Sequence, residues 1–197
     1  TLGCDFLACS PYKFYGPHVG VLWGRAGTLT DVLPPKLAPA PETAPEKWET
    51  GTLNHEGIAG AAAAVDFLAA LAEGGTRGER LDSAFDELSR RGDALIARLW
   101  EGLESVSGVR LYGPRPGAPR TPTLSFTIEG HTPAEAAARL SSEWGLFLSH
   151  GNFYASSVTA RLDVEPEGLL RAGCACYTNR EEVERLIEAV GALAAVS

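Results

Sequence analysis

Methionine is absent from the 197 residues of this chain, and no apolar run is long enough and free enough of charge to cross a membrane. The most apolar stretch, residues 59–71, contains Asp66 and is soon followed by a pair of glycines. A secretory signal, in which a basic segment precedes an apolar one, is also missing. The net charge of -8 disfavours nucleic acid as a partner. We therefore expect neither a membrane nor a nucleic-acid partner.

Cysteine is scarce as well, and occurs as two close pairs, Cys4/Cys9 and Cys174/Cys176. Their spacing is not that of zinc ligands and no histidine pair accompanies them, so the sequence predicts no metal site. So few cysteines fit a reduced, cytoplasmic setting better than a disulfide-bonded secreted domain. Because free cysteine is commonly buried, we interpret Cys174 and Cys176 as core residues.

The apolar pattern predicts alternating strands and helices, and hence an α/β fold. Strands are expected over residues 5–10, 19–24, 109–112, 123–128, 146–149 and 169–176. Helices are expected over residues 54–73, 78–104, 132–144 and 153–162, and from a capping box formed by Thr178 and Glu181 onward. The predicted apolar face of the first of these helices consists of Ile58, Ala61, Ala62, Val65, Leu68 and Ala72.

Residues 33–47 are rich in proline, which excludes a helix or a central strand and predicts an extended loop. A plain linker and a loop that serves a site are both open interpretations.

Lys13 stands on a predicted turn between two short strands, with Tyr12, Phe14 and Tyr15 around it. Aromatic neighbours would partly desolvate the ammonium, which disfavours its charged form. A neutral amine can attack a carbonyl carbon and form a Schiff base. The alternative is a surface lysine whose apolar stem is covered by the rings, and local chemistry leaves both open.

Arg171 lies inside the apolar run 169–176, where an unpaired charge would be costly to bury. The planar guanidinium fits a carboxylate through two parallel hydrogen bonds. That carboxylate could belong to a ligand or to an Asp or Glu of the chain itself.

Three motifs occur in a fixed order along the chain. The first places a serine three residues before Lys13 and a Gly-Pro pair after it, at residues 10–17. The second is Trp-Glu-Thr-Gly-Thr-Leu-Asn at residues 48–54, and the third is Leu-Arg-Ala-Gly at 170–173 with Tyr-Thr-Asn at 177–179. Together they resemble the motifs of the class V aminotransferase and cysteine desulfurase superfamily, which are pyridoxal-phosphate enzymes of fold type I. The resemblance covers nearly the whole chain.

The resemblance implies pyridoxal 5'-phosphate as the cofactor. Lys13 would form the internal aldimine with it and then act as general base at the α carbon of an amino-acid substrate. Ser10 would hold the phosphate, although a turn-capping role is its alternative. Tyr12 stands where desulfurases usually carry histidine, and its hydroxyl could still reach the phosphate. Arg171 would bind the α-carboxylate of the substrate.

In the same family a Gly-Thr pair, here Gly51 and Thr52, reaches the phosphate bound in the partner subunit. This implies a homodimer with shared active sites. The backbone amide, the hydroxyl and the following helix N-terminus together suit an anion. The alternative is that Thr52 or Asn54 only caps that helix.

Desulfurases of this family carry a cysteine nucleophile just upstream of the arginine. In the similar stretch here, residues 150–155, Tyr154 stands at the cysteine position, and a phenol cannot accept sulfur as a persulfide. In a regular strand Cys174 and Cys176 would point away from Arg171. We therefore expect transaminase, epimerase or lyase chemistry. The alternatives are a true cysteine desulfurase or selenocysteine lyase, and a fragment or non-catalytic domain that cannot bind the cofactor alone.

Family members are about twice as long as this chain, which begins with Thr1 and opens almost directly on a strand. We expect a C-terminal half. Residues 1–78 would end a cofactor-binding large domain with a mostly parallel sheet, and would include the loop 33–47. Residues 79–106 would form a connecting helix. Residues 107–197 would form a small α/β domain with a short antiparallel or mixed sheet flanked by helices.

Overall fold

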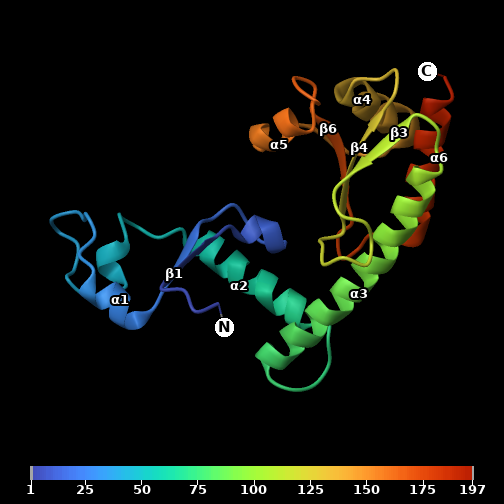
Figure 1. The fold of residues 1–197 in the computed structure, drawn as a ribbon. Coiled ribbons are helices and arrows are strands. Elements are labelled where there is room, and N and C mark those ends of the chain that lie inside the picture. Colours follow the sequence, from blue (N-terminus) through green and yellow to red (C-terminus); the bar gives the residue numbers. More distant parts are fainter. Residues whose placement is uncertain (1, 197) are drawn as a thin grey trace. The chain divides into compact units, whose positions relative to one another are not determined.

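A computed structural model describes residues 2–196, in which strands and helices alternate (Figure 1). Contacts divide the chain into a first unit that ends at Ala84 and a second that begins at Phe85. The first unit holds β1 (Phe6–Cys9), η1 (Pro11–Phe14), β2 (Val21–Gly24), α1 (Ala26–Asp31), η2 (Glu46–Trp48) and α2 (His55–Ala69). Helix α3 (Arg77–Glu104) begins in the first unit and continues into the second. The second unit then holds β3 (Val109–Tyr112), β4 (Thr123–Ile128), α4 (Pro133–Trp144), β5 (Ser149–Gly151), α5 (Ser156–Arg161), β6 (Leu169–Gly173) and α6 (Arg180–Ala194).

Strands β1 and β2 of the first unit pair antiparallel, with Phe6 opposite Gly24 and Cys9 opposite Val21. So short a connection between them cannot carry the crossover that parallel strands require. The α/β class is confirmed, and the two strands within residues 2–84 pair antiparallel with each other, so these residues contain no parallel strand pair.

Helix α1 has no signal in the sequence, because a glycine and two threonines weaken its helical propensity. It is held by the end of the proline-rich loop. The buried Lys47 donates from Nζ to the Thr30 carbonyl at 2.6 Å, and Trp48 donates from Nε1 to the Leu29 carbonyl at 3.0 Å. These bonds satisfy carbonyl groups that have no partner inside the last turn of a helix. A tertiary contact therefore decides that α1 forms.

The buried face of helix α2 agrees only in part with the predicted one, which included Leu68 but also Ile58. Its buried residues are Gly57, Ala64, Leu68 and Ala69, whereas Ile58 is exposed. The small residues lie inward because η1 and the following turn pack closely on α2: a Cβ on Gly60 would lie 3.1 Å from the Pro17 ring. Close approach, not apolar bulk, selects this face.

The second unit contains a four-stranded antiparallel sheet in the order β3-β4-β6-β5, which confirms the short antiparallel sheet expected for this part of the chain. Side chains alternate between its faces, and Leu124, Phe126 and Ile128 of β4 are buried on one of them. Arg171 of β6 lies opposite Ser125 of β4 and is exposed on the other face.

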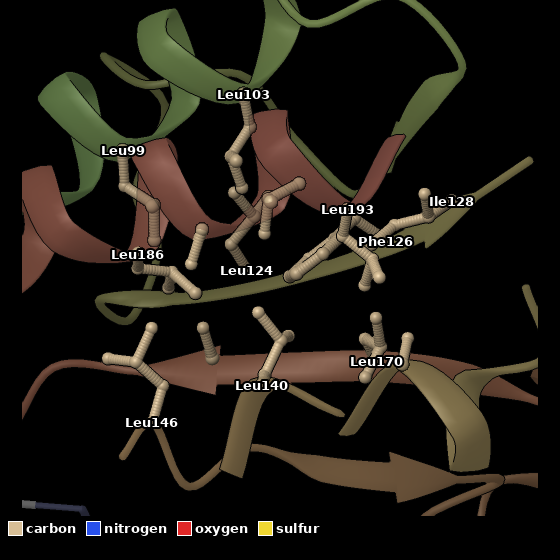
Figure 2. Close-up of a cluster of buried hydrophobic side chains, with 14 of the residues drawn as sticks. Leu99, Leu103, Leu124, Phe126, Ile128, Leu140, Leu146, Leu170, Leu186 and Leu193 are labelled. Carbon is tan, nitrogen blue, oxygen red and sulfur yellow. The ribbon is translucent and has the colours of Figure 1, made fainter. Parts of the chain in front are cut away.

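Helices α3, α4 and α6 supply the rest of the core (Figure 2). Figure 2 shows Leu103 of α3 and Leu193 of α6 pointing toward Leu124 and Phe126 of β4. Helix α6 runs beside the C-terminal part of α3 (Figure 1), where a Cβ on Gly102 would lie 2.3 Å from the side chain of Ile187. One face of the sheet therefore packs against this core, and the other face carries Arg171.

Local signals located most helix starts. Asn54 caps α2 by accepting a hydrogen bond from the Gly57 amide at 2.8 Å, and a capping box of Thr132 and Glu135 opens α4.

None of the helices within residues 2–196 is long and apolar enough to cross a bilayer.

Three boundaries near Arg171 differ from the prediction. Strand β5 begins at Ser149, three residues after the predicted start at 146. Strand β6 ends at Gly173, because a turn follows in which the Thr178 amide donates to the Ala175 carbonyl at 3.1 Å. The capping box of α6 joins Asn179 and Glu182, not Thr178 and Glu181.

Candidate functional site

Lys13 lies on the short helix η1, directly after β1. Its amide donates to the Ser10 carbonyl at 3.0 Å, and the Gly16 amide donates to the Pro11 carbonyl at 2.8 Å. A Cβ on Gly16 would lie 2.8 Å from the Cβ of Pro11, so this tight turn requires glycine. The turn presents the Lys13 side chain to solvent.

The desolvation expected for Lys13 is therefore wrong for the described residues. The Tyr12 ring lies beside the amine without burying it, and it also stacks on His18 with 5.1 Å between centroids. Nζ of Lys13 lies 5.8 Å from the centroid of the Tyr12 ring. The predicted contact of Tyr12 with a phosphate stays a prediction.

Lys13 differs from the two other lysines of the chain, Lys36 and Lys47. Lys36 pairs with Glu42 at 2.9 Å, and Lys47 is buried against α1. Within residues 2–196 no carboxylate lies in ion-pair distance of the Lys13 ammonium. Lys13 thus offers an amine that is both exposed and free of an ion pair.

The Ser10 hydroxyl is available beside it. Ser10 precedes η1, but its side chain makes no capping hydrogen bond, so the capping alternative is not realised in the structure. Ser10 and Lys13 line one open hollow, together with Cys9 and Phe14. Cys9 was not among the expected site residues, and no motif marks it; the pairing of β1 with β2 brings it there.

Gly51 and Thr52 lie on an exposed turn just before α2. A Cβ on Gly51 would meet nothing within 4 Å, so a ligand could approach its backbone. Asn54, rather than Thr52, supplies the helix cap. The Thr52 hydroxyl is thereby left for another acceptor or donor. The phosphate role of this pair stays a prediction.

Arg171 of β6 is exposed, and within residues 2–196 no carboxylate pairs with its guanidinium. The internal ion pair considered from the sequence is therefore not seen. The guanidinium carbon instead lies 4.0 Å from the centroid of the Phe153 ring. Ser125 of β4 and Ser149 of β5 lie opposite Arg171 on either side of β6. No motif in the sequence marks Phe153, because its contact with Arg171 depends on the fold of a turn.

That turn has an unusual backbone. Phe153 and Tyr154 have φ angles of 54° and 58°, a left-handed conformation that bulky residues seldom adopt. The Asn152 side chain accepts a hydrogen bond from the Tyr154 amide at 3.1 Å and steadies the turn. Tyr154 itself is fully exposed. The residue expected at the desulfurase cysteine position is thus presented to solvent and carries a phenol.

Cys174 is partly buried against the core of the second unit and lines a small hollow with Leu99 and Glu182. Burial, and then the charge of Glu182, raise the pKa of the Cys174 thiol above its ordinary value of 9.0. Such a thiol is a poor nucleophile at neutral pH.

Among residues 2–196 no group of His, Cys, Asp and Glu side chains could hold a metal ion.

Comparison with known proteins gives a consistent result. The family model described as aminotransferase class V matches residues 1–186. A probable cysteine desulfurase of Xylella fastidiosa is 32% identical, and the match covers 96% of this chain and 44% of that protein. A cysteine desulfurase of Pectobacterium carotovorum is 28% identical, with 94% and 44% covered. The chain spans less than half the length of these curated relatives.

Two solved structures are also similar. The cysteine desulfurase CsdA of Escherichia coli superposes with a TM-score of 0.78 at 27% identity, over 98% of this chain and 46% of that one. The apo structure of a cysteine desulfurase of Thermococcus onnurineus has a TM-score of 0.84 at 26% identity, over 100% of this chain and 48% of the other.

Proposed function

The chain belongs to the class V aminotransferase family, and from that premise we propose that it carries the cofactor lysine and the carboxylate-binding arginine of an enzyme that acts on an α-amino acid. The family depends on pyridoxal 5'-phosphate. One observation carries the proposal. The Lys13 amine is exposed and has no ion pair, and it shares a hollow with the Ser10 hydroxyl, which makes no capping hydrogen bond.

The residues present fit this cofactor. An amine can bind its aldehyde carbon, and hydroxyl and amide donors suit its phosphate. We assign the amine to Lys13 and the phosphate to Ser10, with Tyr12 as a second contact. Gly51 and Thr52 would hold the phosphate of a partner subunit, which makes the protein a homodimer. When bound, the cofactor supplies an electron-withdrawing ring that stabilises negative charge at the α carbon of the substrate.

The side chains then have two tasks. The Lys13 amine takes or returns a proton at the α carbon of the substrate, as a general base or acid. Arg171 holds the α-carboxylate through two parallel hydrogen bonds, which orients the substrate. Support for this role comes from its unpaired guanidinium on the polar face of the sheet.

Tyr154 limits the reaction type. Sulfur transfer to the protein requires a thiolate near the substrate, and the exposed Tyr154 provides none. We therefore propose transamination, epimerisation or elimination in the cytoplasm. The names of the relatives favour a second candidate, cysteine desulfurase, and the related selenocysteine lyase chemistry stays an alternative. It would need a displaced cysteine.

Chemical mapping tests the lysine assignment. The full-length protein is incubated with pyridoxal 5'-phosphate, reduced with borohydride, digested and analysed by mass spectrometry. We expect the label on the peptide that contains Lys13 and no label in Lys13→Arg. Lys36→Arg is the matched control and should label normally. A label that persists in Lys13→Arg would contradict the assignment.

Sulfide release from L-cysteine separates the two candidates. We expect none from the wild-type protein. Release that disappears in the double variant Cys174→Ser/Cys176→Ser would favour the desulfurase alternative and overturn the reaction type proposed above.

A further inference from the structure

We propose that Phe153 is a positioning residue, whose ring fixes the Arg171 guanidinium so that its hydrogen-bonding edge stays free for the carboxylate of the substrate. The inference rests on the proposed role of Arg171 and adds the reason why this arginine can perform it. It also predicts that an aromatic ring, rather than any apolar side chain, is required at position 153.

The contact itself has the geometry of a cation–π interaction. The guanidinium carbon of Arg171 lies 4.0 Å from the ring centroid, well inside the range of about 6 Å in which such pairs attract. The ring is not a carboxylate and takes up none of the strong hydrogen bonds of the guanidinium, so its five N–H donors stay available for a ligand. An Asp or Glu partner within the chain would accept hydrogen bonds from these N–H groups and leave fewer of them for a ligand. The ring therefore restrains the arginine without competing with a ligand.

The register of the sheet leaves room for a carboxylate next to this edge. Ser125 and Ser149 lie opposite Arg171 on the two neighbouring strands, and so on the same exposed face. Both side chains are short, hydroxyl-bearing and uncharged. They neither cover the guanidinium nor neutralise it, and a hydroxyl on each side can donate to a bound carboxylate.

The backbone shows that the ring is held in place. A bulky residue at a φ of 54° is strained, and the next residue shares the strain at 58°. The turn is tied by the Asn152 side chain and by the Ala155 amide, which donates to the Asn152 carbonyl at 2.8 Å. Strain of this kind persists where the surroundings fix a conformation, often at a functional site. Here it directs the Phe153 ring to Arg171.

The test compares Phe153→Leu, which keeps apolar volume but loses the ring, with the conservative variant Phe153→Tyr. The first readout is the Nε–H resonance of Arg171 in an NMR spectrum, identified by its absence in Arg171→Lys. A ring stacked on the guanidinium shifts this resonance upfield. We expect the shift to be lost in Phe153→Leu and retained in Phe153→Tyr, with unchanged circular dichroism in both.

The second readout is a titration with L-alanine as carboxylate probe, performed on the full-length protein. We expect binding about fivefold weaker in Phe153→Leu, near wild-type in Phe153→Tyr and lost in Arg171→Ala. If Phe153→Leu binds the probe as the wild type does while Arg171→Ala does not, the positioning role is overturned and the Arg171 assignment stands. If Arg171→Ala binds the probe normally, the proposed role of Arg171 fails, and the purpose given to Phe153 fails with it.

Discussion

A Cβ atom on Gly168 would lie 2.3 Å from the carbonyl carbon of Gly151, so two glycine backbones pass each other where β5 ends and β6 begins. Gly168 also has a φ of 76°, in the left-handed region that favours glycine. This close approach sets the start of the turn that carries Phe153, and thereby links packing to the proposed carboxylate site.

We expect Gly168→Ala to lower the free energy of unfolding by about 3 kcal/mol, because it adds both backbone strain and overpacking against Gly151. The measurement is urea unfolding followed by circular dichroism. Gly173→Ala, at the end of β6, is the matched control, since its Cβ would meet the Thr123 side chain at an ordinary 3.6 Å. Equal stability of the two variants would show that the backbones do not approach as closely as described.

A pH-dependent contribution is expected from Glu184 of α6. Arg98 of α3 donates to both carboxylate oxygens, at 2.7 and 2.5 Å. The hydrogen bonds from Arg98, and then from Arg180, hold the pKa of Glu184 below its ordinary value of 4.5. Because the folded-state pKa is the lower one, the stabilisation is complete above pH 4.5 and is lost as the pH falls through the folded-state pKa.

The measurement is the urea midpoint of the wild type and of Glu184→Gln between pH 7 and pH 3. We expect the variant to be the less stable at pH 7, and the difference to shrink as the pH falls below 4.5. A difference that does not change with pH would contradict the role given to the ionised carboxylate.

Thiol labelling should distinguish the cysteines. Cys9 is exposed, whereas Cys174 is partly buried with a raised pKa. Since the thiolate is the reactive species, we expect a maleimide to label Cys9 before Cys174 at pH 7, with the rate at Cys174 rising as the pH becomes alkaline. Mass spectrometry of quenched digests gives both rates. Faster labelling of Cys174 would reopen it as a candidate nucleophile.

Local signals predicted much of the second unit. The strands over residues 109–112 and 123–128 were predicted with their observed bounds, and Thr132 with Glu135 marked the start of α4. These features depend on alternation and capping, which neighbouring residues determine. The predicted apolar face of α2 was right at Leu68 and wrong at Ile58, because contact with η1 decides which residues of this helix lie inward.

The candidate site shows the same division. The order of the three motifs identified the family and the types of group it needs: a lysine, a serine, a Gly-Thr pair and an arginine. The motifs could not show whether Arg171 pairs with a carboxylate of the chain itself. They also could not show whether the Ser10 hydroxyl makes a helix-capping hydrogen bond. Both answers depend on which side chains meet in space.

The sequence by itself therefore determined the family, its cofactor and the chemical types of the expected site residues, because these are carried by short motifs. Only the tertiary structure decided that α1 forms against Lys47, that the Lys13 amine has no ion pair, and that the Phe153 ring contacts the Arg171 guanidinium. The physical reason is that each of these results depends on which side chains meet groups distant in the sequence. Local propensity carries no information about these contacts.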